Sequence, residues 1–561
     1  MRCPASALFL LAAALAAPPP DPRPAPGAVV LAPSARARFT VLSPSLLRLQ
    51  YASDGVFSDA PTLAIVNRAL PVPAFTSSFN ATTGVLTLTT GALTLTFNDS
   101  AAAPSAACAA PAPGTDAGPP RVRSVAFPAG APAADAAACC AACARAPDCA
   151  AYVFDDAQRV CFPLASFNGT VPARNRTFAA HAAGGGFSRA SLRIAAAALP
   201  GGAPLAWAPG DEQAANLLGT VTQMDCYTTP AECFATYTAE LAASRGLLAR
   251  DGWTVFDDSA TTLRGPPRAD GSRWWAPPRA GDVDLYFSAY GDDFRGALAG
   301  FASVMGAPEL PPRAALGIFW SQNYPWTNIT GNTSIVTGVL DQYAALDIPL
   351  STLVLDMDWH VRHQSDAECA TWGSWDFNTT AFPDPAGFLQ WLNSSANPLG
   401  HPLATSLNVH PQTGAYHCLE RYAAFAAAAN ASSAHNETIP CDMASEAWIN
   451  ALWSVYYDAQ PLSSTSFFWT DYGGCGGSEA GAPPQLLWSN TVYAEQRARS
   501  GALRPLTFSR YGGWGNPNIG FSGDTFQHEL TLDFEIRMTP TAANALFGYW
   551  SHDMCVQRPQ R

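Results

Sequence analysis

The sequence contains no lysine, so its 31 basic residues are all arginine. Enzymes that form a Schiff base between a lysine amine and a carbonyl substrate are therefore excluded. Positive charge is also scarce, since the net charge is -13 at pH 7 and no basic patch is evident along the chain. Because nucleic acids and acidic membrane surfaces are bound through clustered positive charge, we expect neither as a partner.

Long apolar runs are also lacking. One run covers residues 5–17; it follows Arg2 and precedes a proline cluster, which is typical of a secretory signal peptide at residues 1–17. This run is too short to span a bilayer, and no later run is longer. We therefore predict a secreted or endomembrane-lumenal protein without a membrane span, and we favour the extracellular space.

N-glycosylation sequons support entry into the secretory pathway. They begin at Asn80, Asn98, Asn168, Asn175, Asn328, Asn332, Asn378, Asn393, Asn430 and Asn436. Metal-ligand clusters, in contrast, are missing. His360 and His363 have H-x-x-H spacing but no third ligand, so we interpret them as loop or helix residues and expect neither a metal nor a cofactor.

The 14 cysteines predict disulfides in a secreted protein. Cys3 would leave with the signal peptide, and an odd number then remains. The candidate half-cystines are Cys108, Cys139, Cys140, Cys143, Cys149, Cys161, Cys226, Cys233, Cys418 and Cys441. For the half-cystine left over we favour Cys555, with Cys369 and Cys475 as alternatives. The C-x-x-C pair among them favours disulfides over zinc, because no second ligand pair follows at zinc-finger spacing.

Period-2 alternation of apolar residues predicts antiparallel strands in two separate parts of the chain. We assign residues 28–107 and 186–305 to one N-terminal β-sandwich and expect strands in the second part at residues 190–199, 217–227, 252–259 and 282–291. Between the two parts, residues 108–185 contain a low-complexity stretch and a crowded group of cysteines. This segment resembles a PAN/apple domain, which implies a glycan or protein ligand for the insert.

Residues 311–561 alternate strand-like and helix-like patterns, which predicts a parallel (β/α)8 barrel. The candidate strands lie at residues 315–322, 351–359, 403–411, 466–474, 504–513, 518–524 and 545–553. The predicted fold class is therefore multidomain α/β plus β: a β-sandwich, a small disulfide-rich insert and an incomplete barrel with strands 1–7 only.

Carboxylates recur where these predicted strands end, and active sites of such barrels lie at that end. They are Asp356, Asp358, Asp471, Asp524 and Asp553, and the accompanying aromatic residues include Trp320, Trp469 and Phe521. Carboxylates can accept hydrogen bonds from sugar hydroxyls, and aromatic rings can stack on the apolar faces of sugars. This combination therefore indicates an oligosaccharide or glycoside substrate.

The chain resembles glycoside hydrolase family 31, the α-glucosidase and α-xylosidase family, through an ordered series of motifs. They include LLARDGWTVFDDS, LVLDMDWH, LNVHP, FFWTDYGG, FSRYGG, GFSGDTF and YWSHD. The resemblance implies retaining hydrolysis of α-linked glucosides or xylosides by two carboxyl groups. Asp471 matches the catalytic nucleophile of the family, and Asp524 matches its general acid/base.

The same resemblance implies substrate-binding roles for further residues. Asp356 matches the residue that binds the far hydroxyls of the sugar, Arg510 a residue that contacts the same sugar, and Asp553 an acid near the floor of the pocket. We include Asp358, Trp320, Trp469 and Phe521 among the candidate substrate contacts. Residues 472–474, Tyr-Gly-Gly, depart from the family pattern after the nucleophile.

Two alternative functions stay open at this point. One is an inactive family member that acts as a secreted carbohydrate-binding protein; the other is an α-glucan lyase or transglycosidase of the same family. In this family an eighth barrel strand and further β-domains follow the seventh strand, and neither is found before Arg561. We therefore expect that the chain is C-terminally truncated and that these 561 residues alone are inactive.

Overall fold

The computed structural model describes most of the chain from residue 20 onward. The described residues are 20–100, 187–268, 272–308, 310–321, 333–361, 374–431, 437–471, 475, 482–499, 504, 506–510, 512–514 and 518–552, with the backbone of six strands between residues 112 and 180. The predicted signal peptide lies outside these residues. Among the described helices, none combines the length and the apolar character needed to cross a membrane.

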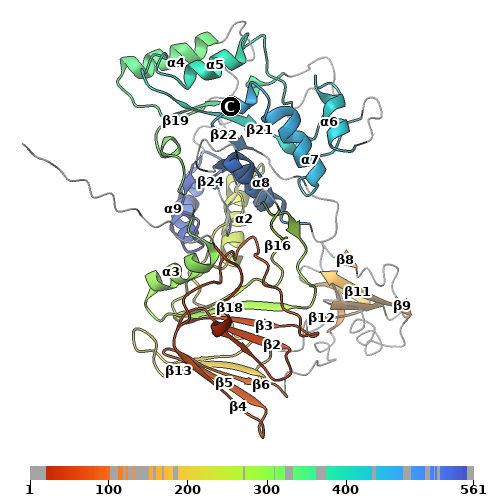
Figure 1. Cartoon of the computed structure of the whole chain (residues 1–561). Coiled ribbons are helices and arrows are strands. Elements are labelled where there is room, and N and C mark those ends of the chain that lie inside the picture. Colours follow the sequence, from red (N-terminus) through yellow and green to blue (C-terminus); the bar gives the residue numbers. More distant parts are fainter. Residues whose placement is uncertain are drawn as a thin grey trace, which may run out of the picture.

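Two five-stranded antiparallel sheets form the base of the molecule in Figure 1. One contains β1 (Val29–Leu31), β2 (Ala37–Val41), β3 (Leu46–Tyr51), β18 (Val283–Ala289) and β15 (Trp253–Asp257); the other contains β14 (Leu205–Trp207), β13 (Leu192–Ala196), β6 (Thr94–Asn98), β5 (Val85–Thr90) and β4 (Phe75–Asn80). Alternate side chains of β13 are buried, and strands of both sheets share one apolar core. Each sheet combines strands from before and after the predicted insert.

The strand predicted at residues 217–227 is wrong, because this segment is irregular. Its backbone groups bond to scattered partners and not to one neighbouring strand. Thr222 donates its backbone N–H to a carboxylate oxygen of Glu240 (2.7 Å), and Cys226 donates to the carbonyl oxygen of Asp524 (3.3 Å). An apolar alternation does not make a strand when the chain offers it no partner edge. The segment leads directly into helix α2 (Pro230–Ala243).

A third sheet lies where the insert was predicted. It contains β7 (Ala112–Ala117), β12 (Thr170–Ala180), β10 (Ala151–Asp155), β11 (Val160–Ser166), β8 (Val122–Arg123) and β9 (Ala131–Pro132). Of the cysteines predicted to staple this module, Cys161 lies in β11, while Cys108, Cys139, Cys140, Cys143 and Cys149 lie outside the described residues. The PAN/apple-like module and its pairings stay predictions.

Seven parallel strands form the sheet of the C-terminal part, in the order in which they occur in the chain. They are β19 (Phe319–Trp320), β20 (Thr352–Leu355), β21 (Ala404–Val409), β22 (Phe467–Thr470), β23 (Thr507–Ser509), β24 (Asn518–Phe521) and β25 (Trp550–Ser551). Each lies within a range predicted from the sequence. β19 and β25 are the two edges of this sheet, so the described strands form an open and not a closed barrel.

Helices connect most of these strands and bury their apolar side chains against the sheet. They are α4 (Thr333–Ala345), α5 (Pro385–Leu392), α6 (Tyr422–Ala428), α7 (Glu446–Ala451) with a π-helix continuing it (Leu452–Tyr457), α8 (Gln485–Arg499) and α9 (Glu529–Ala543). The one-sided apolar pattern of α9 is obscured in the sequence, because its outward face carries Leu532 and Ile536, both more than half exposed.

Helix α3 (Phe294–Met305) and the short hairpin of β16 (Leu263–Arg264) and β17 (Trp275–Ala276) lie between the two sheet regions. The hairpin contacts the barrel through Trp274, whose ring meets the ring of Trp488 in α8 edge to face at 5.1 Å. Arg264 completes this contact with an ion pair to Glu495 (2.6 Å). The N-terminal part is therefore packed against the barrel.

Four predicted half-cystines are disulfide-bonded. Cys226 pairs with Cys233, Cys441 pairs with Cys475, and Cys418 is also in a disulfide. Cys475, named above as an alternative for the unpaired half-cystine, is therefore paired. Its partner Cys441 follows α6 in the chain, so the bond ties the loop after β22 to the helical layer.

Candidate active site

Polar side chains converge at the carboxyl ends of five neighbouring barrel strands, β20 to β24. Asp356 follows β20, Asp471 follows β22, Arg510 follows β23, and Asp524 lies three residues after β24. The register brings these ends level: Asn408 of β21 is opposite Trp469, and Ser509 is opposite Gly520. The structure thus brings Asp356, Asp471, Arg510 and Asp524 together at one mouth of the barrel.

Asp471 is buried, and its carboxyl group contacts an arginine, an asparagine and a histidine. Arg510 Nη2 donates to Asp471 Oδ1, Asn408 Nδ2 donates to Oδ2 (3.0 Å), and His410 Nε2 lies 3.5 Å from the same oxygen. Burial raises the pKa of the Asp471 carboxyl, but Arg510, His410 and Asn408 outweigh it and lower the pKa well below its usual range. Asp471 is therefore ionised throughout the physiological range.

Asp524 has a different environment, with about a quarter of its side chain exposed. Its Oδ1 lies 3.7 Å from Arg510 Nη2, and the hydroxyl of Tyr227 donates to its Oδ2 at 3.0 Å. Burial raises the pKa of Asp524; Arg510 opposes this, and the charge of Asp471 adds to it, so that the net pKa is raised. The two carboxyl groups thus differ in the direction of their pKa shifts.

One guanidinium nitrogen fixes how far apart these two carboxyl groups can lie. Arg510 Nη2 contacts Asp471 Oδ1 and Asp524 Oδ1. The distance between these two oxygens therefore cannot exceed the sum of the two contact distances. This bound is compatible with the separation of about 5–5.5 Å between carboxyl groups that retaining glycosidases use.

Asp356 forms the third carboxylate of the cluster. Its side chain accepts bonds from the Met357 N–H (2.8 Å), the Ser321 hydroxyl (3.0 Å) and Asn408 Nδ2 (3.3 Å), at the start of a 3-10 helix, Met357–Trp359. Burial raises the pKa of Asp356 to about 6, with a further contribution from the charge of Asp471. Asn408 bridges both acids and so ties their positions together.

The predicted aromatic contacts lie mostly inside the barrel. Trp469 and Phe521 belong to a buried aromatic cluster with Phe508, and Arg510 lies over the Phe521 ring at 5.5 Å. Trp320 is half-buried and packs against the apolar cluster beneath the helices. The Phe521 ring thus packs against Arg510 of the polar cluster, while the role of these rings as sugar contacts stays a prediction.

Two predicted site residues cannot be placed in the same way. Asp358 lies in the 3-10 helix after β20, where only its backbone is described, and Asp553 lies outside the described residues. Their predicted roles as substrate contacts stay predictions. Among the described residues, no group of His, Cys, Asp or Glu side chains has an arrangement that could hold a metal ion.

Four residues of the cluster were given no role from the sequence. Asn408 lies in β21 and His410 directly follows it, two positions later, so both side chains lie on the same face, toward the barrel interior. This two-residue spacing is visible in the motif LNVHP. Asp225 and Tyr227 come from the irregular segment before α2, some 300 residues from Asp524 in the chain. Asp225 accepts bonds from Arg510 and from the backbone N–H of Asp524 (2.9 Å). No local pattern identifies such distant partners.

Comparison with known proteins supports the barrel assignment. Residues 308–557 match the TIM-barrel domain of glycosyl hydrolases family 31. An α-xylosidase of Emericella nidulans is 28% identical over 129 residues, which cover 23% of this chain and 14% of that enzyme. The chain thus matches only a small part of this curated relative.

Solved structures agree on the fold. A family 31 dextranase of Flavobacterium johnsoniae in complex with glucose has a TM-score of 0.50 and 13% identity, covering 92% of this chain and 58% of that one. A xylosidase of Aspergillus niger has a TM-score of 0.50 and 13% identity, covering 92% and 69%. Residues 308–557 therefore form a barrel domain that matches the TIM-barrel domain of glycosyl hydrolases family 31.

Proposed function

We propose that the protein is a retaining glycoside hydrolase that cleaves α-linked glucosides or xylosides. The observation that carries this proposal is the single arginine nitrogen shared by Asp471 and Asp524, two carboxyl groups whose pKa values are shifted in opposite directions. A double displacement needs this asymmetry, because one group must attack as an anion while the other delivers a proton.

Each residue then has a defined task. Asp471, ionised beside Arg510, attacks the anomeric carbon and forms a covalent glycosyl-enzyme; Asp524 donates its proton to the leaving oxygen. In the second step, Asp524 accepts a proton from water, the water attacks the anomeric carbon, and Asp471 leaves as a carboxylate. Two inversions give net retention of configuration.

Asp356 and Arg510 supply the substrate contacts in this proposal. Asp356 lies beside Asp471, through their shared partner Asn408, and can accept hydrogen bonds from sugar hydroxyls. The curated relative is an α-xylosidase, and the similar structures are a xylosidase and a dextranase, so α-xylosides and α-glucosides are the first substrates to test.

The test is product analysis with aryl α-glucosides and α-xylosides. We expect NMR to detect initial release of the α-anomer, and Asp471→Asn to lower kcat by about a thousandfold or more. Asp384→Asn is the matched control, since the Asp384 side chain caps α5 by accepting from the Gly387 N–H and asparagine caps equally well.

Four outcomes would contradict the proposal. Initial release of the inverted anomer would exclude a double displacement. An unsaturated anhydro sugar would identify a lyase, and transfer of the glycosyl group to a second sugar would identify a transglycosidase. Binding of the glycoside without turnover would leave a carbohydrate-binding protein.

A further inference from the structure

Three consecutive residues of the segment before α2 each bond to Asp524. Asp225 Oδ1 accepts from the Asp524 backbone N–H (2.9 Å), the Cys226 N–H donates to the Asp524 carbonyl oxygen (3.3 Å), and the Tyr227 hydroxyl donates to Oδ2 (3.0 Å). Backbone and side chain of Asp524 are therefore both held by residues from outside the barrel.

The close approach of Asp225 depends on the glycine before Asp524. Gly523 has a φ of +76°, and a Cβ at this position would collide with Asp225 Oδ1. The backbone therefore adopts a conformation that favours glycine, in a place where only glycine leaves room for the carboxylate.

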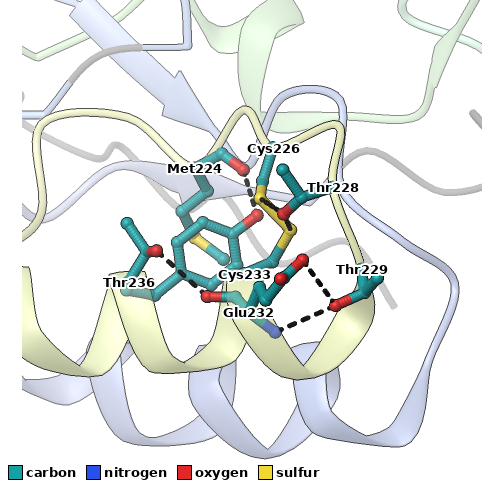
Figure 2. Close-up of a disulfide and its surroundings, with 8 residues drawn as sticks. Met224, Cys226, Thr228, Thr229, Glu232, Cys233 and Thr236 are labelled. Carbon is teal, nitrogen blue, oxygen red and sulfur yellow. Dashed lines mark hydrogen bonds between the residues drawn. A yellow bond between two sulfur atoms is a disulfide. The ribbon is translucent and has the colours of Figure 1, made fainter.

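A disulfide closes the segment that carries these three residues (Figure 2). Cys226 is bonded to Cys233 in the first turn of α2, and the Thr228 hydroxyl lies 3.4 Å from Cys226 Sγ. Thr229 caps the helix by accepting from the Glu232 N–H (3.3 Å). We call residues 225–233 the clamped turn.

The clamped turn is anchored to the barrel by its own helix. α2 packs along α9, where the Tyr237 ring lies 5.2 Å from that of Phe534, and Met538 is buried in the same cluster (Figure 1). Since α9 follows β24 and Asp524 in the chain, the turn and the carboxyl group that it holds share one rigid support.

Five titratable or charged groups lie around the Asp524 carboxyl group. Arg510, Asp471 and His410 come from the barrel strands, and Asp225 and Tyr227 come from the clamped turn. Tyr227 is 56% exposed, whereas Arg510 is buried. The Tyr227 hydroxyl therefore donates to Asp524 from an exposed residue of the clamped turn, whereas Arg510 contacts Asp524 from a buried position at the end of β23.

We propose that the clamped turn is a positioning element for Asp524 and that Tyr227 is its positioning residue. The hydroxyl orients the carboxyl group and stabilises its ionised form, which the second step of hydrolysis requires. This inference rests on the proposed role of Asp524 as acid/base. It assigns a part of the reaction to the N-terminal region and not to the barrel.

Tyr227→Phe tests the hydroxyl alone, because the ring stays in place. Without the donor, the pKa of Asp524 rises, so we expect the basic limb of the kcat/KM profile to move up by about half to one pH unit.

A comparison of leaving groups tests the same hydroxyl. With an alkyl glycoside, whose leaving group needs a proton, kcat/KM should fall about tenfold in Tyr227→Phe. With a glycosyl fluoride, which leaves without a proton, the fall should stay below about twofold. Tyr422→Phe, which removes a hydroxyl that donates to the Glu437 carbonyl oxygen, should change neither value.

A titration that needs no turnover separates this inference from the proposed function. Carboxyl-13C aspartate labelling, with the Asp524→Asn spectrum subtracted, gives the titration midpoint of Asp524 in the full chain. We expect a higher midpoint in Tyr227→Phe and in the Cys226→Ala/Cys233→Ala double variant. An unchanged midpoint in Tyr227→Phe overturns the inference, even in an active retaining enzyme. A raised midpoint in a protein that cleaves no glycoside supports the inference and contradicts the proposed function.

Discussion

At the scale of single residues, the surroundings stabilise the ionised form of one acid of the cluster and destabilise the ionised form of another. Asp471 has a lowered pKa, so its ionised form adds to stability above the usual aspartate range and this contribution is lost as the pH falls. Asp356 is the opposite case. Its pKa is raised to about 6, so its ionisation in the folded state opposes folding as the pH rises through that value.

Replacing Asp356 should therefore stabilise the protein at neutral pH. We expect Asp356→Asn to raise the free energy of unfolding by about 1–3 kcal/mol at pH 7.5, where the carboxylate is buried and charged, and to change it little at pH 4. Denaturant unfolding at both pH values measures this. A destabilised variant at pH 7.5 would mean that the bonds from Ser321 and Met357 outweigh the cost of the charge.

Much of this cluster could be predicted from sequence, and the remainder could not for a physical reason. Asp356, Asp471 and Asp524 follow buried parallel strands, and such strands bring their carboxyl ends together whatever the chain between them does. Asp225 and Tyr227 have no such periodic signal. Their position depends on the tertiary packing of α2 on α9, and the sequence predicts neither of these two helices.

At the scale of elements, α2 couples the N-terminal region to the barrel. Its first turn is stabilised by an N-cap, since the Thr229 hydroxyl accepts from the Glu232 N–H and donates to Glu232 Oε2 (2.8 Å) (Figure 2). Pro230 occupies the first helical position. The element that holds Asp524 therefore depends on local capping as well as on the disulfide.

Removing the cap should weaken the helix start selectively. We expect Thr229→Ala to lower the free energy of unfolding by about 0.5–2 kcal/mol. Thr236→Ala in the same helix removes a hydroxyl that only bonds back to the Glu232 carbonyl oxygen, and should cost less. Thermal denaturation of the two variants provides the comparison, and equal losses would argue against a capping role for Thr229.

At the scale of the whole molecule, the N-terminal part and the barrel contact each other at several separate places (Figure 1). One contact is that of α2 with α9, and another is that of the β16–β17 hairpin with α8, where Trp275 Nε1 also donates to the Ala444 carbonyl oxygen (2.9 Å). In a third contact, the rings of Phe256 in β15 and Trp514 of the barrel lie 5.3 Å apart, centroid to centroid. Such contacts couple the stability of both parts.

The two parts should therefore unfold together. We expect calorimetry to detect one cooperative transition for the β-sandwich and the barrel, with equal calorimetric and van't Hoff enthalpies. Trp274→Ala combined with Phe534→Ala, which empties two of the three contacts, should split it into two transitions. A split transition in the unmodified protein would mean that these contacts are too weak to couple the parts.

The clamped turn also bears on when the site can form as the chain is synthesised. The disulfide joins residues only 7 apart, so it can close as soon as α2 has entered an oxidising compartment. The contact between Asp225 and Asp524 spans 299 residues, and closing so long a loop is slow. The clamped turn can therefore form before Asp524 has been synthesised, and its bonds to Asp524 form only after β24 has joined the barrel sheet.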